Sequence, residues 1–310
     1  MKYVFAGTPE NAAQTLSSLI AAGFEFGLVL TRTDSPVGRS RKIEASPVAK
    51  IAEAAGIPLL KTNQLDKASL EKLRDSGCAL GIVVAYGLIL KPAFLEALPM
   101  GWINVHYSLL PELRGAAPVQ QALIRGYRET GISIFQLDEG MDTGPIYLQI
   151  PTRIEPFENS RELLNRLTHL GISGLMEVIP ALMSGTARAK PQDISNVTFA
   201  PKIQRDQAII DWNSSSAILE NQIRGLNPEP MAWTKYLETT VRIHDAFACE
   251  SNELNKNYSV GHVFVESKKV KVVCGDDTFL QLQIVQPAGK KVMDAQDWYR
   301  GLDPRNLILG

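Results

Sequence analysis

An asparagine, a histidine and an aspartate stand in this sequence where they could act together on a carbonyl group. Asn104 and His106 close an apolar stretch, and Asp142 follows in the later run Met141-Asp142-Thr143-Gly144. An imidazole exchanges a proton near neutral pH, an amide donates to an oxyanion, and a carboxylate orients the ring and favours its charged form. These residue types predict acid–base and oxyanion chemistry at a single site.

The predicted set contains no side-chain nucleophile. Ser108 is the candidate nearby, and its setting Ser-Leu-Leu-Pro is not the glycine-flanked turn that exposes a catalytic serine. We therefore expect a substrate group to attack, while the protein stabilises charge and moves a proton. The triplet Asp142-Thr143-Gly144 also occurs in aspartic proteases, but that chemistry requires two carboxylates that share a proton, and the chain has one such triplet.

The elements that must position these residues alternate along the first half of the chain. Strands are expected at residues 3–6, 27–31, 78–85, 102–105, 132–137 and 145–150, and helices at 10–22, from Ser46-Pro47, at 68–76, 118–125 and 159–184. Such alternation indicates an α/β fold with a Rossmann-like parallel sheet covered on both faces. Ligands bind beyond the carboxyl ends of the strands in these sheets, where Asn104, His106 and Asp142 are expected to meet.

The pattern changes in the second half of the chain. Residues 189–205 are polar and irregular, and a helix near 214–225 precedes four β-rich runs at 241–248, 260–266, 269–273 and 279–285. Short strands separated by turns indicate a small antiparallel, OB-like β-barrel. We therefore expect a catalytic domain over 1–188, a linker over 189–205 and a barrel domain over 206–310.

Length and composition restrict the class of protein. A chain of 310 residues is long enough for two domains, and its formal net charge of −1 argues against coating nucleic acid by bulk charge while leaving room for a local basic patch. The sequence shows no leader segment and no apolar run long enough for a membrane helix, and its three cysteines form no Cys-x-x-Cys pair. We expect a cytoplasmic protein with reduced thiols. No histidine outside the trio has partners at metal-ligand spacing, so no metal site is expected, and without a heptad seam we expect a monomer.

Two glycine-containing segments are candidates for contact with a ligand. Phe5-Ala6-Gly7-Thr8-Pro9 is not a dinucleotide fingerprint, because Pro9 starts the helix and no second glycine clears space for a pyrophosphate. The segment 32–42 is a long basic loop that contains Arg39, Arg41 and Lys42. It is either a solvated loop or a functional one that adapts to a phosphate backbone.

Four motifs together make the chain resemble the folate-dependent formyltransferases. They are Ile103-Asn104-Val105-His106, Ser108-Leu109-Leu110-Pro111, Arg114-Gly115-Ala116-Ala117-Pro118 and Met141-Asp142-Thr143-Gly144. Further segments at 5–9, 84–90, 226–233 and 286–291 extend the resemblance over nearly the whole chain and narrow it to the members that act on a tRNA.

The resemblance implies 10-formyltetrahydrofolate as the formyl donor and the α-amino group of methionyl initiator tRNA as the acceptor. It implies catalytic roles for Asn104, His106 and Asp142, and a tRNA contact for the loop with Arg39, Arg41 and Lys42 and for the barrel. Two segments would line the folate site. One consists of Ser108, Leu109, Leu110 and Pro111, and the other of Leu88, Ile89 and Leu90.

The chain departs from the family pattern at two places near the trio. Tyr107 stands where the family usually has glycine, and Glu112-Leu113 replaces a basic and aromatic pair. Residues 208–310 also carry 11 basic against 13 acidic residues, so an RNA-binding barrel must concentrate lysines such as Lys268, Lys269, Lys271, Lys290 and Lys291 on one face.

Two alternatives remain open from the sequence. One is a formyltransferase that acts on a small amine, such as a purine-pathway ribonucleotide or an amino sugar. The other is a non-enzymatic RNA-binding protein that retains the pocket as a scaffold. The basic loop and the second domain argue against a small-amine enzyme, and Tyr107 is the one feature that favours the scaffold.

Overall fold

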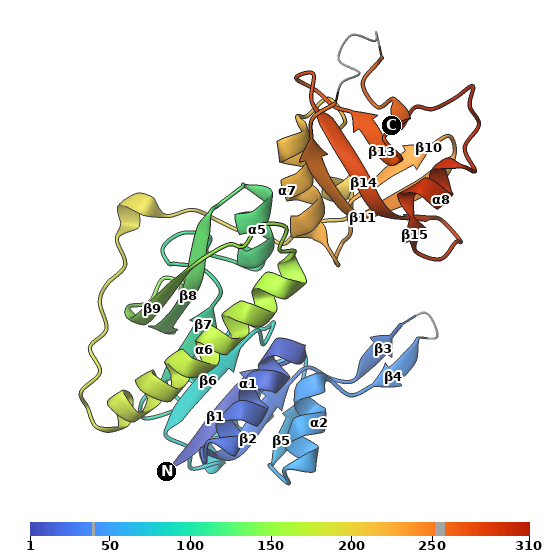
Figure 1. Cartoon of the computed structure of the whole chain (residues 1–310). Coiled ribbons are helices and arrows are strands. Elements are labelled where there is room, and N and C mark those ends of the chain that lie inside the picture. Colours follow the sequence, from blue (N-terminus) through green and yellow to red (C-terminus); the bar gives the residue numbers. More distant parts are fainter. Residues whose placement is uncertain (39–40, 252–257) are drawn as a thin grey trace. The chain divides into compact units, whose positions relative to one another are not determined.

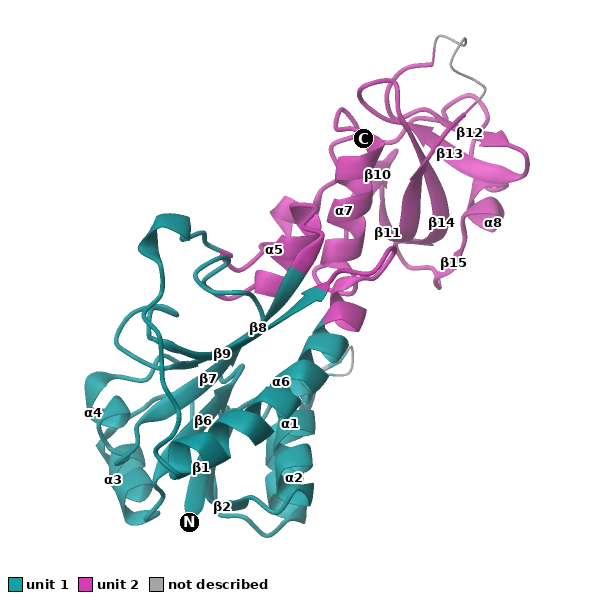
Figure 2. Cartoon of the chain, turned by 60° about the vertical axis from the view of Figure 1, so that its left-hand side comes forward, with its two compact units in different colours: residues 1–115, 130–152, 164–199 teal, residues 116–129, 153–163, 200–310 magenta. Residues whose placement is uncertain are grey.

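The computed structural model describes residues 1–38, 41–251 and 258–310. The chain forms two compact units, which are described separately below. Unit 1 comprises residues 1–115, 130–152 and 164–199, and unit 2 comprises residues 116–129, 153–163 and 200–310 (Figure 2). Each unit is assembled from several stretches of the chain, so the division in space is not a single cut in the sequence.

A seven-stranded sheet forms the centre of unit 1, in the order β5-β2-β1-β6-β7-β8-β9 (Figure 1). Its strands are β1 (Lys2–Gly7), β2 (Glu25–Thr31), β5 (Leu59–Lys61), β6 (Leu80–Val84), β7 (Trp102–His106), β8 (Glu129–Gln136) and β9 (Ile146–Arg153). The first five in sheet order pair in parallel, which confirms the expected Rossmann-like α/β core. The three-residue strand β5 was not expected.

The sheet is parallel over most of its width but not throughout. β8 pairs antiparallel with β7, with His106 opposite Ser133 and Asn104 opposite Phe135. The expected Rossmann-like sheet is thus mainly parallel, and its β8 edge is antiparallel. Strand direction depends on where the chain re-enters the sheet, and the apolar pattern of a buried strand is the same for either direction.

Helices cover both faces of this sheet. α1 (Glu10–Ala21), α2 (Pro47–Ala54) and α6 (Ser160–Met183) lie on one face, and α3 (Lys67–Asp75) and α4 (Pro92–Leu95) on the other (Figure 2). The N-cap expected at Ser46 is confirmed, because its hydroxyl accepts from the Ala49 backbone N–H and Pro47 follows at the first helical position.

Two glycines let α6 approach the sheet closely. A Cβ atom on Gly171 would lie 2.9 Å from Val105 Cγ1, and one on Gly174 would lie 2.9 Å from Ile134 Cδ1. Val105 therefore faces α6. Since side chains alternate along a strand, its neighbours Asn104 and His106 face the opposite side of the sheet.

The basic loop between β2 and α2 contains a small hairpin. β3 (Ser35–Val37) pairs antiparallel with β4 (Lys42–Glu44), and the hairpin projects from the body of unit 1 (Figure 1). Arg39 falls outside the described residues, whereas Arg41 and Lys42 are described and exposed.

Unit 2 is built around an antiparallel sheet with strands in the order β10-β11-β14-β13-β12, and β15 pairs with β14. These are β10 (Trp233–Tyr236), β11 (Thr239–Cys249), β12 (Val263–Glu266), β13 (Lys269–Val273), β14 (Phe279–Pro287) and β15 (Met293–Asp294). The sheet forms the antiparallel half-barrel expected of an OB-like domain.

Helices complete unit 2 around its own core. α7 (Ser216–Leu226) packs on β11, and α8 (Ala295–Tyr299) packs on β13 and β14. α5 (Pro118–Ile124) lies against α7, where Gly225 leaves room for Ile124. The core contains Trp212, Leu219 and Ile223 beneath the buried side chains of the half-barrel. Among the described residues, none of the helices combines the length and the apolar character needed to cross a lipid bilayer.

Candidate active site

Asn104 and His106 lie at the carboxyl end of β7, on the same face of the sheet. His106 is the last residue of the strand and is buried, with 5% of its surface exposed, and Asn104 is half-buried. Residues two apart on a strand point to the same side, so the amide and the imidazole share one environment. The sequence therefore placed both groups correctly at a strand end.

Both ring nitrogens of His106 face oxygen atoms. Nε2 lies 2.9 Å from the carbonyl oxygen of Leu113, and Nδ1 lies 3.6 Å from Asp142 Oδ2. A carbonyl oxygen can only accept, so Nε2 carries the proton in this tautomer and donates to Leu113. The Asp142 carboxylate lies beside the other ring nitrogen, Nδ1. The structure thus brings together the His106–Asp142 pair predicted from the sequence.

A strained loop presents Asp142 to the ring. Asp142 has a φ of 54°, in the left-handed region, and its Oδ2 accepts a hydrogen bond of 2.8 Å from the Gly115 backbone N–H. Gly144 makes the turn possible, because a Cβ atom there would lie 1.8 Å from the Gln136 carbonyl oxygen. Gln192 donates to the carbonyl oxygens of Asp142 and Gly144, at 2.8 Å each. Sequence reasoning assigned no role to Gln192.

The Asn104 amide is open for a ligand. It makes no hydrogen bond with any residue that the structure describes, although it stands two residues before the buried imidazole. An unengaged N–H donor at a strand end can bind an oxygen that becomes negatively charged during a reaction. An acyl or formyl carbonyl placed here would have an amide donor and an imidazole–carboxylate pair beside it.

Tyr107 points away from this site. Its hydroxyl accepts a hydrogen bond of 2.9 Å from Asn11 Nδ2 on α1 and also bonds Thr168 on α6. Burial raises the pKa of the Tyr107 hydroxyl, so it stays protonated at neutral pH. The side chain therefore fills the space between the sheet and these helices, as strand alternation requires, and leaves the catalytic side of β7 unobstructed.

Removing the Tyr107 hydroxyl is expected to affect stability and not catalysis. In Tyr107→Phe the buried Asn11 amide loses its acceptor, which should lower the free energy of unfolding by about 1–3 kcal/mol. Urea denaturation measures this loss, and kcat should stay near the wild-type value. Tyr3→Phe is the matched control, since the Tyr3 hydroxyl bonds none of the described residues. A lower kcat with unchanged stability would place Tyr107 on the catalytic side instead.

The segment Ser108, Leu109, Leu110 and Pro111 is held in a fixed conformation by two residues that the sequence did not single out. Ser133 Oγ donates to the Ser108 carbonyl at 2.7 Å and accepts from the Leu110 N–H at 3.0 Å. Gln149 Nε2 donates to the Leu110 carbonyl at 2.8 Å. The Ser108 hydroxyl itself donates to the Glu112 carbonyl at 2.6 Å, so the geometry gives it no role as a nucleophile.

The segment Leu88, Ile89 and Leu90 follows β6 with its backbone unengaged. Within the described parts of the chain, none of these three residues makes a backbone hydrogen bond. Leu90 is buried in the core, whereas Ile89 is 81% exposed. Unpaired N–H and C=O groups on an exposed loop are suited to the hydrogen-bonding edge of a planar ligand.

Arg32 supports this segment and is therefore not part of a free basic surface. Its guanidinium donates to the Gly87 carbonyl at 3.0 Å and to Asn63 Oδ1 at 2.7 Å. Asp34, the acid of the loop, is paired with Lys61 at 3.0 Å. Arg41 and Lys42 make no ion pair with the described residues, so their positive charge is available to a partner.

The remaining histidines lie outside the site. His169 contacts Gln14, His244 contacts Gln286, and the ring of His262 stacks on Tyr258. Over residues 1–38, 41–251 and 258–310, no group of three or more His, Cys, Asp and Glu side chains is arranged to hold a metal ion.

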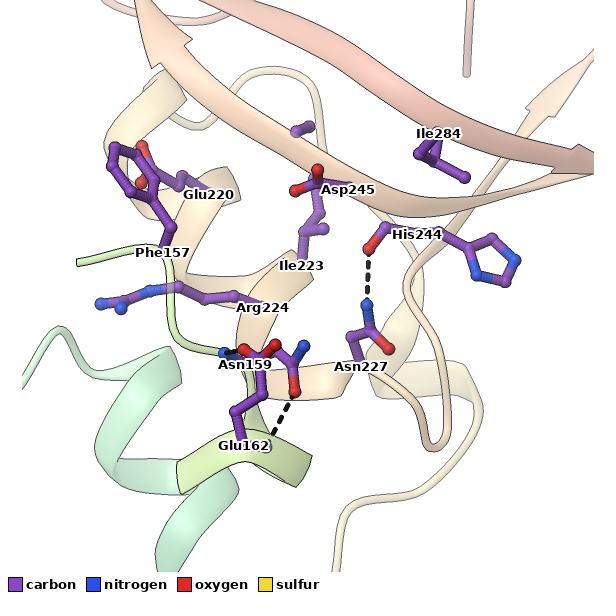
Figure 3. Close-up of a pocket in the computed structure, with 11 residues that line it drawn as sticks. Phe157, Asn159, Glu162, Glu220, Ile223, Arg224, Asn227, His244, Asp245 and Ile284 are labelled. Carbon is purple, nitrogen blue, oxygen red and sulfur yellow. Dashed lines mark hydrogen bonds between the residues drawn. The ribbon is translucent and has the colours of Figure 1, made fainter. Parts of the chain in front are cut away.

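A cavity of about 350 Å³ lies in unit 2 and is separate from the Asn–His–Asp trio. It is lined by residues that include Glu162, Glu220, Arg224 and Asp245 (Figure 3). Glu220 on α7 accepts from the Ala248 N–H on β11 and so joins the two elements, whereas Arg224 donates to Asn221 within α7 itself. The His244 ring points away from the other residues drawn, and the cavity holds no imidazole–carboxylate pair (Figure 3).

Comparison with known proteins gives a formyltransferase match for the N-terminal and the C-terminal part of the chain. Residues 1–179 match the formyl transferase family and residues 202–303 match the formyl transferase C-terminal domain. The methionyl-tRNA formyltransferase of Clavibacter michiganensis is 40% identical over 308 residues, covering 99% of both chains. That of Streptomyces coelicolor is 40% identical over 303 residues, covering 97% of this chain and 96% of its own.

Solved structures share the fold at low sequence identity. The N-formyltransferase of Helicobacter canadensis, solved with folinic acid and dTDP-3-aminofucose, superposes with a TM-score of 0.67 at 18% identity, over 91% of this chain and 99% of its own. HypX of Aquifex aeolicus, solved with tetrahydrofolic acid, gives 0.67 at 13% identity, over 96% of this chain and 46% of its own. Full-length identity to the curated relatives, with both domains matched, shows that this chain belongs to the formyltransferase family, and within it to the methionyl-tRNA formyltransferases.

Proposed function

We propose that this protein transfers the formyl group of 10-formyltetrahydrofolate to the α-amino group of methionyl initiator tRNA. The observation that carries the proposal is the open Asn104 amide beside the buried His106–Asp142 pair. This arrangement suits a reaction in which a carbonyl oxygen gains negative charge and a proton must be moved. The product would be N-formylmethionyl-tRNA, and the formyl donor is a folate, as the family implies.

The residues suggest a direct transfer without a covalent enzyme intermediate. The neutral amine forms a bond to the formyl carbon, and the carbonyl electron pair moves to the oxygen. Asn104 would donate to that oxyanion, and His106 in its cationic form would add positive charge. Asp142 would hold His106 in that form and assist removal of the amine proton. The bond from carbon to N10 then breaks, and N10 receives a proton as tetrahydrofolate leaves.

We assign the folate to the surface made by two loops at the strand ends. The free backbone of Leu88, Ile89 and Leu90 would bind the pterin edge. The segment from Ser108 to Pro111, fixed by Ser133 and Gln149, would line the other side. The folate in these positions is substrate, since its formyl group is consumed in each turnover.

The proposal is tested by formylation assays with three acceptors: methionyl initiator tRNA, methionyl elongator tRNA and free methionine. Rapid formylation of the initiator tRNA alone is the expected result. Transfer to a small amine at a comparable rate would support the alternative of a small-molecule formyltransferase. Folate binding without transfer to either tRNA would contradict the proposed acceptor and leave the folate site standing.

We infer that the chain has a catalytic domain over 1–188, a linker over 189–205 and a tRNA-binding domain over 206–310. Four exposed lysines of the half-barrel would contribute to the tRNA-binding surface. Lys268 and Lys269 lie at the turn between β12 and β13, and Lys290 and Lys291 follow β14. Because β13 and β14 are antiparallel neighbours, with Val270 opposite Leu282, these two loops lie at the same end of the sheet. Such a cluster gives a domain of negative net charge a local site for phosphates.

Lys271 does not belong to this cluster, although the sequence made it a candidate. It is 6% exposed, forms an ion pair with Glu266 and donates to the Glu250 carbonyl. Its neighbour Val270 is also buried, so the residues of β13 that follow the exposed Lys269 all lie in the interior. A buried and paired ammonium group is not available to an RNA phosphate.

Truncating the basic hairpin is expected to weaken tRNA use alone. In Arg41→Ala and Lys42→Ala, the KM for methionyl-tRNA should rise while the KM for the folate stays unchanged. The slope of log KM against log salt concentration should fall by about one for each phosphate that the variant no longer neutralises. Lys50→Ala is the control, because Lys50 is paired with Glu44 at 3.3 Å. A fall in folate affinity would assign the hairpin to the other substrate.

A further inference from the structure

The chain after α6, up to residue 199, packs against two loops that hold the His106 ring. One loop contains Leu113 and Arg114, and the other contains Asp142 and leads into β9. Lys190 exchanges backbone hydrogen bonds with Ile146, which begins β9, at 2.8 and 2.9 Å. Farther on, Thr198 Oγ1 accepts from the Leu113 N–H at 2.8 Å, and the Thr198 carbonyl accepts from the Arg114 N–H at 2.9 Å. All of these residues belong to unit 1. This part of the predicted linker therefore packs against the catalytic trio's own loops.

Gln192 uses its whole amide group to join these loops. Its Nε2 donates to the carbonyl oxygens of Asp142 and Gly144, both at 2.8 Å. Its Oε1 accepts from Arg114 Nη2 at 2.6 Å and from Arg114 Nε at 3.2 Å. The carbonyls can only accept and the guanidinium can only donate, so the partners define which end of the amide is which.

These contacts reach His106 from both sides of its ring. Asp142, whose carbonyl Gln192 holds, has a left-handed φ of 54° and presents Oδ2 toward Nδ1. Arg114 binds the other end of Gln192, and both of its neighbours in the chain contact the pair. The Leu113 carbonyl accepts from His106 Nε2, and the Gly115 N–H donates to Asp142. A strained backbone persists only where its surroundings determine it, and Gln192 supplies that constraint.

We propose that Gln192 is a positioning residue for formyl transfer. It fixes the separation and orientation of Asp142 and the Leu113–Gly115 loop, and thereby the protonation and direction of the His106 ring. It contacts none of the trio's reacting groups, so its effect must pass through them. Residues that orient a catalytic or ligating side chain in this way typically change activity by about 10- to 100-fold when replaced. The inference rests on the function proposed above.

Gln192→Glu tests this role with minimal change in shape. A carboxylate still accepts from Arg114 but has no N–H for the carbonyls of Asp142 and Gly144, which it repels. We expect kcat to fall by about 10- to 100-fold, with KM for both substrates altered by no more than about threefold. Gln192→Met, which removes both sets of bonds without adding charge, should lower kcat in the same way. Asp193→Ala is the matched control, since the Asp193 side chain accepts from Ser195 and Asn196 within the short helical turn that it caps and bonds no catalytic loop among the described residues.

A second measurement separates positioning from structural support. The chain has four histidines, so the ring signals of His106 can be assigned by nuclear magnetic resonance with a His106 variant. Both Gln192 variants should shift the His106 titration and displace the pH–rate profile in the same direction, while Asp193→Ala leaves both unchanged. An unchanged His106 titration, or a kcat loss that matches only the unfolded fraction, would overturn the proposal. If the wild-type protein formylates no tRNA, the proposed function fails, yet the ring titration still decides whether Gln192 positions His106.

Discussion

Replacing His106 with alanine is expected to lower kcat by about 10²- to 10⁴-fold, the usual scale for a lost acid–base group. The imidazole sits with both nitrogens facing oxygen atoms, on the same face of the sheet as the open Asn104 amide. Without it, the developing oxyanion loses the positive charge that the ring is proposed to supply. Single-turnover formylation with saturating folate measures the step directly.

His169→Ala is the control for that experiment, because His169 is exposed and contacts only Gln14 through its ring. Its rate should match the wild type. The KM for both substrates in His106→Ala should change little, since the ring is expected to act in the transition state and not in ground-state binding. A near-normal rate for His106→Ala in a folded protein would remove His106 from the catalytic set.

Replacing Asn104 with alanine is the second large effect that we expect, a loss in kcat of about 10²- to 10³-fold. Preorganised donors to an oxyanion contribute about 3–4 kcal/mol each to transition-state stabilisation, because the site has already oriented them. The Asn104 amide bonds none of the described residues, so its removal should leave the free energy of unfolding nearly unchanged. Activity and stability should therefore separate.

Asn104→Asp sharpens this test. The side chain keeps its shape but loses its N–H donor and places negative charge where the oxyanion forms, so its rate should be at or below that of Asn104→Ala. Asn63→Ala is a control with a different expected pattern. Asn63 accepts from Arg32, and Arg32 in turn donates to the Gly87 carbonyl next to the Leu88–Leu90 loop. The substitution should raise the folate KM more than it lowers kcat. A higher folate KM with normal kcat in Asn104→Ala would make Asn104 a binding residue only.

Local patterns in the sequence were sufficient for most of the elements. The helix expected at 159–184 is α6 (Ser160–Met183), and the strand expected at 269–273 is β13 without any change in its bounds. Both have a strong periodic or alternating pattern of apolar residues, which is set by burial on one face or both. β5 and the β3–β4 hairpin were missed because three-residue strands have no period to detect and are defined by their pairing partners.

The candidate site also has parts that local sequence patterns predict and parts that only tertiary contacts define. Residue types and motif spacing were enough to propose Asn104, His106 and Asp142 as one set, and the structure brings His106 and Asp142 together. They could not reveal Gln192, whose partners Asp142 and Arg114 lie 50 and 78 residues away along the chain. A polar, irregular stretch has the same composition whether it is solvated or packed on a catalytic loop, so only the folded chain distinguishes the two.

By itself, then, the sequence determined the chemistry available to this protein, since side-chain type and strand periodicity place an amide and an imidazole at one strand end. Tertiary structure alone decided how that chemistry is held. The direction of Tyr107, the tautomer of His106 and the constraint on Asp142 depend on contacts with Asn11, Leu113 and Gln192. Those contacts form between distant segments, and no local pattern encodes which segments will meet.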